Sequence, residues 1–144
     1  MCRIRGGKLE FLLGHPGGPF WRKKDSGAWT IAKGEIGQSE DPLMAATREF
    51  EEELGFKAEG PFIELKPVQQ KSGKIVHAWG FIGDCDPAQI KSNVFEIEWP
   101  PGSGRRQEFP EIDRAEWFDL ETAKEKINPA QIPLLEELTR KVGG

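Results

Sequence analysis

Three glutamates close together on one predicted helix are the residues in this sequence best suited to chemistry. Glu49, Glu52 and Glu53 are one to four residues apart, so a helix would bring their carboxylates onto one arc of its surface. Like charges at this spacing repel one another, and a divalent cation would turn the repulsion into attraction. Mg²⁺ and Mn²⁺ prefer such hard oxygen ligands. The cluster by itself predicts either a divalent metal site or an ordinary solvated acidic face.

The helix that carries the glutamates has clear start and stop signals. Asp41 is suited to cap its first turn, Pro42 fits the first helical position, and Gly55 can adopt the left-handed conformation that ends a helix. Arg48 lies four residues before Glu52, where it can orient a carboxylate by charge-assisted hydrogen bonds. A stripe with helical spacing predicts the core-facing side. Its members are Leu43, Ala46, Thr47, Phe50 and Leu54.

Short strands are predicted on both sides of this helix, and two helices are predicted at the end of the chain. The strands are 8–13, 29–31, a hairpin of 62–70 with 74–83, 94–99 and 116–118; the helices are 121–127 and 130–142. His15 and residues 100–106 are expected in loops. This order favours an α/β fold in which helices cover a mixed β-sheet, with residues 1–144 as a single domain.

The composition limits the class of protein. The 144 residues include 24 acidic and 20 basic ones, a net charge of −4, which argues against a general nucleic-acid surface. Cys2 and Cys85 are too few for a disulfide framework or a thiolate metal site. The sequence contains no apolar run of ~18 residues, so no membrane span is predicted. It has no apolar segment near its start, so no secretory signal is predicted either. These features predict a cytoplasmic protein.

The glutamates also belong to a longer pattern of fixed spacing. Its specified positions are Gly34, Glu40, Arg48, Glu49, Phe50, Glu52, Glu53, Gly55 and Phe56. With seven specified residues at ~7% background each and two apolar positions, a chance match is on the order of 10⁻⁹ per starting point. At every specified position the pattern resembles the Nudix box of the Nudix hydrolase family. This resemblance outweighs the interpretation of a plain acidic helix.

The resemblance implies a Nudix-type α/β/α sandwich with a mixed β-sheet. Nudix hydrolases use a divalent metal, usually Mg²⁺, to cleave nucleoside diphosphates linked to another moiety; Mn²⁺ is the expected substitute. By similarity, Glu49, Glu52 and Glu53 would bind the metal, with Glu52 and Glu53 also catalytic. Arg48 would hold the catalytic glutamates in place. Glu40 would support the site from behind these ligands.

The loop before the helix and a loop late in the chain complete the expected site. By similarity, the loop at Gly34 would direct a backbone carbonyl at the metal, and Lys33 would reach a phosphate. Within the family, the general base comes from the box helix or from a later loop glutamate. Glu111, six residues before Trp117, resembles that loop glutamate in members that cleave dinucleoside polyphosphates. Glu108 is the nearest alternative.

The substrate class is less sharply indicated than the reaction. Residues 14–33 resemble a bacterial group of predicted NTP pyrophosphohydrolases, whereas the late Glu111 pattern resembles the dinucleoside polyphosphate branch. A nucleoside triphosphate or a dinucleoside polyphosphate is therefore the expected small-molecule substrate. Phe20 and Trp21, in a Pro/Gly-rich loop, are candidates to stack on a base, and Arg105 is a candidate to bind phosphate.

The alternative function is a catalytically silent Nudix-fold module that binds nucleotides or proteins. A degenerate binder would be expected to lose one of the box glutamates, and this sequence keeps them all. The acidic balance and the lack of a basic appendage also argue against a role in nucleic-acid decapping. The sequence does not indicate an oligomeric state.

Overall fold

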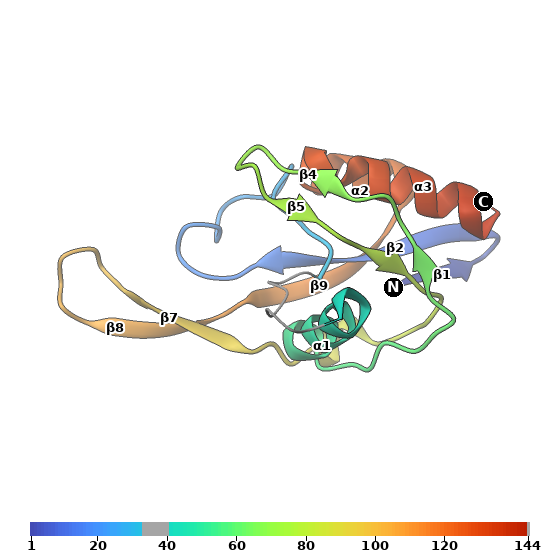
Figure 1. The fold of residues 1–144 in the computed structure, drawn as a ribbon. Coiled ribbons are helices and arrows are strands. Elements are labelled where there is room, and N and C mark those ends of the chain that lie inside the picture. The colour runs from blue at the N-terminus through green and yellow to red at the C-terminus, as the bar shows by residue number, and fades with distance from the viewer. Residues whose placement is uncertain (33–40, 144) are drawn as a thin grey trace.

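The computed structural model describes residues 1–32 and 41–143 and places β-strands between helices (Figure 1). The helices are α1 (Pro42–Leu54), α2 (Leu120–Lys126) and α3 (Ile132–Val142). The strands are β1 (Cys2–Arg5), β2 (Lys8–Pro16), β3 (Ile63–Glu64), β4 (Val68–Gln69), β5 (Ile75–Val76), β6 (Trp79–Gly80), β7 (Val94–Glu98), β8 (Arg106–Pro110) and β9 (Ile112–Asp119). None of the helices in these described residues has the length and apolar character needed to cross a membrane.

The largest sheet has the order β1-β2-β9, so its central strand pairs with the strand before α2. Both pairings are antiparallel, and Phe11 of β2 lies opposite Cys2 on one side and Phe118 on the other. A parallel bridge between Cys2 and Ile82 attaches the segment after β6 to β1. An antiparallel bridge joins Gly14 to Thr30. The sheet is therefore mixed, as the sequence predicts.

Alternating side chains of β2 divide the core into two layers. Phe11 and Leu13 pack with residues of α2 and α3 in one cluster, whereas Leu12 packs with Phe50 of α1 in the other. In Figure 1, α2 and α3 accordingly lie above β2 and β9, and α1 lies below them. This arrangement is the expected α/β/α sandwich.

Two hairpins extend the structure. The first is the predicted one, in which β4 pairs with β5 and β3 with β6 across the turn at residues 71–73. The second, which we call the arm, consists of β7 and β8 and projects beyond the helices at the left of Figure 1. The predicted loop 100–106 forms the tip of the arm, except that Arg106 is already the first residue of β8.

Several predicted boundaries are wrong. β1 and β8 are not predicted, because both are short and each contains two charged residues. β9 begins at Ile112 rather than at residue 116, and His15 lies in β2 rather than in a loop. In the predicted strand 29–31, Trp29 and Thr30 form isolated bridges and Ile31 forms none. On α1, Phe50 is buried as predicted, but Ala45, outside the predicted stripe, is buried as well.

Candidate active site

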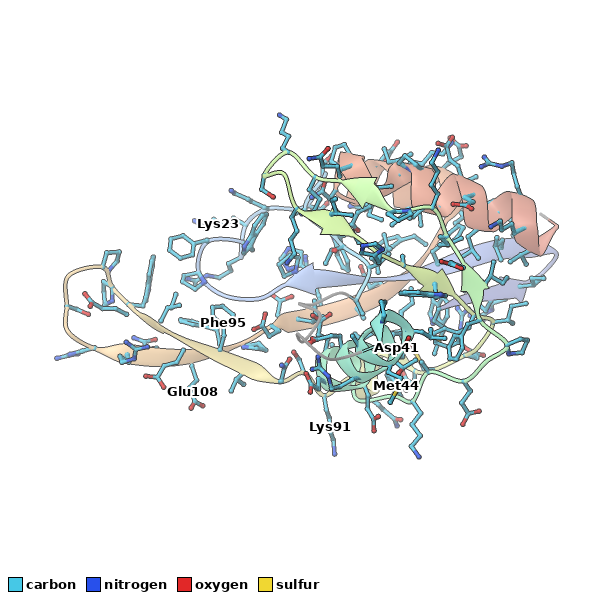
Figure 2. All side chains as sticks on the ribbon, in the orientation of Figure 1. Lys23, Asp41, Met44, Lys91, Phe95 and Glu108 are labelled. Carbon is cyan, nitrogen blue, oxygen red and sulfur yellow. The ribbon has the colours of Figure 1, made fainter. Side chains whose placement is uncertain are left out.

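The ends of α1 are fixed by the residues that the sequence indicates. The Asp41 carboxylate accepts a hydrogen bond of 3.2 Å from the Met44 backbone N–H, which satisfies a donor of the first turn. Gly55 has a φ of 79° and donates its N–H to the Glu51 carbonyl at 2.7 Å. Both labelled residues of the first turn, Asp41 and Met44, lie at the same end of the helix in Figure 2. The spacing of the acidic side chains along α1 is therefore fixed by a capped helix.

One side of α1 turns acidic side chains inward. Ala45, Glu49 and Glu53 recur every four residues, and their exposure is 1% for Ala45, 14% for the Glu49 side chain and 8% for Glu53. Two carboxylates this close and this poorly hydrated need a compensating positive charge or hydrogen-bond donors. Glu49 and Glu53 are both less exposed than Glu52, whose side chain is 42% exposed.

Glu52 lies on a different side of α1 from Glu53. Its side chain is 42% exposed, and both of its carboxylate oxygens accept a hydrogen bond of 3.2 Å from Nη1 of Arg48. The same nitrogen lies 2.9 Å from Oε1 of Glu49. Arg48 thus links the half-exposed Glu52 to the inward-facing Glu49, which is the orienting contact expected from its position on the helix.

Glu111 reaches the same region through a relay of backbone hydrogen bonds. The Asn93 N–H donates to the Glu52 carbonyl at 2.7 Å, and the Asn93 carbonyl accepts from the Glu111 N–H at 2.9 Å. The Glu111 carbonyl then accepts from the Gly17 N–H at 2.9 Å. The last turn of α1, the start of the arm and the loop after β2 are therefore tied together at Glu111.

A β-bulge lies directly beside Glu111. The register between β2 and β9 shifts between His15 and Pro16, which pair with Arg114 and Ile112, so Asp113 is the extra residue. The fully buried His15 lies between two oxygens, Oδ1 of Asp113 at 2.9 Å from its Nδ1 and the Lys24 carbonyl at 2.6 Å from its Nε2. Bulges commonly re-aim a side chain next to an active site. His15 holds this bulge, a role that the sequence did not indicate.

These elements enclose a cleft of about 550 Å³ between α1, β9 and the first hairpin. Glu49, Glu53 and Glu111 contribute its acidic groups, and Lys74 contributes a cation. The other lining residues are Pro16, Trp21, Ala28, Thr30, Gln70, Asn93, Ile112 and Asn128. A cleft that combines carboxylates, a cation and an aromatic ring has the donor set for a metal-bound phosphate ester with a planar group.

The structure sorts the predicted site residues into three groups. Glu49, Glu53, Glu111 and Trp21 line the cleft. Arg48 and Glu52 do not line it and are joined to Glu49 through the Arg48 contacts, so they belong to the same group. Phe20, Arg105 and Glu108 are exposed and do not line it. Lys33, Gly34 and Glu40 lie outside the described residues. In Figure 2 the Glu108 side chain extends from the arm away from the rest of the protein.

Lys74 and Gln70 are cleft residues that sequence reasoning missed. Both come from the β4–β5 hairpin, and the predicted hairpin gave no signal of which side faces the site. The Gln70 Oε1 accepts a hydrogen bond of 3.0 Å from Nε2 of the fully buried Gln131, so the hairpin is held in place by the segment before α3. Lys74 lies in that held hairpin, across the cleft from the glutamates.

The carboxylates fit a metal that also takes ligands from its substrate. Among the described residues, no group of three or more acids, histidines or cysteines is assembled as a metal cage. Mg²⁺, however, is usually bound by one or two carboxylates together with water and substrate phosphates. Glu49 and Glu53, one helical turn apart and both directed into the cleft, supply such a pair.

Solved structures with the same fold cover almost the whole chain. An Ap4A hydrolase of C. elegans, in a binary complex, aligns with a TM-score of 0.68 at 23% identity over 99% of this chain and 94% of that chain. The NUDIX domain of Shewanella oneidensis NrtR, complexed with ADP ribose, aligns with a TM-score of 0.64 at 12% identity, covering 98% and 82% of the two chains. The E. coli ORF135 protein aligns with a TM-score of 0.53 at 27% identity over 98% of this chain and 87% of that chain. The fold is therefore that of a Nudix domain.

The sequence itself matches the family profile of the NUDIX domain over residues 1–138. The chain therefore belongs to the Nudix family. A curated relative, an octanoyltransferase of Myxococcus xanthus, is 30% identical over 106 residues, which are 74% of this chain. The aligned region is only 27% of that relative's length, so the similarity concerns a part of a longer protein.

Proposed function

We propose that this protein is a metal-dependent hydrolase that cleaves a phosphoanhydride bond of a nucleoside triphosphate or a dinucleoside polyphosphate. The observation that supports the proposal most directly is the meeting of Glu49 and Glu53 of α1 with Glu111, from a distant segment, in one cleft. The proposal extends the family membership to a reaction and a substrate class for this chain.

Glu49 and Glu53 would hold Mg²⁺, with Glu52 as a third carboxylate of the same helix, oriented by Arg48. When bound, the metal would neutralise the phosphate oxygens that otherwise repel an attacking water. Arg48 keeps two of these carboxylates in fixed positions through contacts of 2.9 and 3.2 Å. Lys74, across the cleft, would bind a phosphate oxygen as a point charge.

Glu111 is the preferred general base. It lines the cleft opposite α1, from which a carboxylate can take a proton from water while the helix carboxylates stay on the metal. Glu108, the alternative from the same region, lies on β8 opposite Glu96 and is exposed. Trp21 would stack on the base of the nucleotide from the loop after β2.

A substrate panel tests this function. The protein is incubated with ATP, diadenosine tetraphosphate, ADP-ribose and a sugar nucleotide, with Mg²⁺ or with excess chelator, and the products are separated by chromatography. We expect hydrolysis of one of the first two substrates, abolished by chelator and restored by Mg²⁺ or Mn²⁺. Full turnover in excess chelator would contradict the metal role. Nucleotide binding without turnover of any substrate would identify the silent module instead.

A further inference from the structure

The arm formed by β7 and β8 has one aromatic face and one charged face. Its register places Phe95 opposite Phe109, with ring centroids 6.0 Å apart, and Glu96 opposite Glu108. Directly opposed residues of an antiparallel pair project to the same side. In Figure 2 the Phe95 side chain accordingly extends toward the loop after β2, whereas Glu108 extends the other way.

The loop after β2 packs against the aromatic face at van der Waals distance. A Cβ on Gly17 would lie 1.9 Å from the Pro110 carbonyl oxygen, and one on Gly18 would lie 2.8 Å from Cζ of Phe95. Further out, the Phe20 ring meets the Trp99 ring edge-on at 5.5 Å. The two segments are therefore joined at their base by glycines and at their rim by aromatic rings.

A groove of about 540 Å³ lies between this loop and the arm. Trp99, Phe109 and Pro19 give it apolar walls, and Arg22, Gln107 and Asp113 give it polar groups. Its size lies within the range of about 300–1,000 Å³ that is typical of small-molecule sites. Flat apolar walls with a few polar groups suit a planar heterocycle that carries hydrogen-bonding edges, such as a nucleobase.

The carboxylate of Asp113 is held in place before any ligand arrives. Its Oδ1 is 2.9 Å from Nδ1 of the buried His15, while the side chain remains 32% exposed on the side of the groove. A carboxylate fixed from behind can accept a hydrogen bond from an amino or ring N–H group without losing side-chain freedom. Gln107, on the arm, offers both a donor and an acceptor.

The groove and the catalytic cleft share the segments that separate them. Glu111 and Ile112 line the cleft, and their chain neighbours Pro110 and Asp113 line the groove. On the loop, Trp21 lines the cleft and Arg22 lines the groove. The groove therefore adjoins the cleft through these chain neighbours, and Arg22 gives it a cation for a phosphate that extends from the cleft.

We infer that this groove binds the second nucleoside of a dinucleoside polyphosphate, whose phosphates lie in the cleft. The inference rests on the proposed function and selects, from its two substrate classes, the one with an aromatic group at both ends. It also gives Trp99, Arg22 and Asp113 a role in substrate choice. A mononucleotide leaves the groove empty and gains nothing from these side chains.

A comparison of the two substrate classes tests the groove. We would measure kcat/KM for diadenosine tetraphosphate and for ATP with Mg²⁺, and the Kd of both ligands without metal, in the wild type and in Trp99→Ala and Arg22→Gln. The matched control for Trp99→Ala is Glu98→Ala, at the preceding residue, on the charged face of β7. The matched control for Arg22→Gln is Lys23→Gln, at the following residue of the loop. We expect the dinucleotide-to-ATP ratio of kcat/KM and of 1/Kd to fall about tenfold or more in the two groove variants. The ratio should stay within about twofold in the controls.

An equal loss for both ligands, or an unchanged ratio, would overturn the inference. If the wild type hydrolyses neither substrate, the proposed function fails, and the metal-free Kd ratio still decides whether the groove recognises a second nucleoside. Light scattering addresses the other possible occupant of the aromatic face, a second copy of the chain. A dimer that Trp99→Ala converts to a monomer, without a change in either ratio, would assign the face to self-association.

Discussion

The three acidic residues that line the cleft are all glutamates, but their surroundings differ. Glu53 is 8% exposed and belongs to a rigid, capped helix, so it faces the cleft without freedom to move toward solvent. Glu111 follows β8 and precedes the bulge in β9, and its own backbone N–H and carbonyl are both bound. We therefore expect the helix glutamates to hold the metal and Glu111 to handle the proton.

Replacing each glutamate by glutamine separates these roles. Glu53→Gln keeps the size and removes the charge, so metal affinity and turnover should fall together, by about 10- to 100-fold. Glu111→Gln should leave Mg²⁺ binding intact and slow turnover by about 10²- to 10⁴-fold, with a change in the acidic limb of the pH–rate profile. Calorimetric Mn²⁺ titration and kcat measurements distinguish the two.

Glu108→Gln is the matched control for the base, because Glu108 lies three residues before Glu111, on β8 and outside the cleft. It should keep wild-type activity. A crippled Glu108→Gln beside a normal Glu111→Gln would move the base to Glu108. If neither change slows turnover, the base lies on α1.

Among the elements, the junction between the loop after β2 and the arm controls where Glu111 sits. The Gly17 N–H donates to the Glu111 carbonyl, and the Gly17 Cα faces the Pro110 carbonyl with no room for a methyl group. A backbone atom cannot swing aside as a side chain can. The loop after β2 and the arm would have to separate to admit a methyl group at Gly17.

Gly17→Ala should therefore lower kcat by about 10-fold or more. Mg²⁺ affinity should stay near that of the wild type, because the capped helix α1 positions Glu49 and Glu53 and contacts this junction only through the Glu52 carbonyl among the hydrogen bonds described above. The melting temperature should also fall, since the clash is with backbone. Gly83→Ala is the control: the atoms nearest to its added Cβ belong to the Met1 and Phe81 side chains, at 3.3 Å, which can adjust. Equal kcat in the two variants would show that the junction does not position Glu111.

At the scale of the whole molecule, acidic side chains attach the last two helices to the rest. The Asp25 carboxylate binds Lys126 at the end of α2, and these contacts hold the pKa of Asp25 below its ordinary value. The Glu137 carboxylate accepts a hydrogen bond of 2.7 Å from the Lys66 backbone N–H and pairs with Lys141 at 2.8 Å. The Lys141 contact and the Lys66 N–H hold the pKa of Glu137 below its ordinary value of 4.5.

Acid should therefore weaken the packing of these helices. A carboxylate with a lowered pKa in the folded state stabilises it fully above the unfolded-state pKa and loses that effect as pH falls through the folded-state pKa. Thermal unfolding from pH 7 to pH 3 should show Glu137→Gln melting below the wild type at pH 7, with the gap closing below about pH 4.5. Glu59→Gln, an exposed acid outside these contacts, should follow the wild type throughout. A difference in melting temperature that stays constant with pH would show that the charge of Glu137 is not the cause.

The sequence predicts the helix and the placement of its acidic side chains well, because both depend on local spacing. The ends of α1 follow from Asp41, Pro42 and Gly55, and the convergence of Glu49 with Glu53 follows from helical periodicity. Glu111 was singled out through its resemblance to a family pattern, and the structure places it in the cleft. The roles of these residues stay predictions.

What the sequence could not supply depends on contacts between distant segments. Lys74 and Gln70 reach the cleft from a hairpin that core packing and a buried glutamine from the segment before α3 hold in place. His15 looks like part of a Pro/Gly-rich loop, and its role becomes visible only when Asp113 is placed beside it. Phe20 was expected to stack on a base in the active site, but its ring meets Trp99 of the arm, a strand pair whose second member was not predicted.

The strand order has a consequence for how the chain folds. β2 is the central strand of its sheet, yet its second partner, β9, lies at the other end of the chain; the His15–Asp113 contact alone joins residues 98 positions apart. Closing so long a loop costs entropy before the pairing returns any energy, and proteins dominated by such distant contacts fold slowly. Until residues 112–119 arrive, β2 pairs with β1 alone among the strands of its sheet, and Phe11 and Leu13 lack the helices that cover them. The acidic cleft is assembled by the same late event, because Glu111 immediately precedes the strand that closes the sheet.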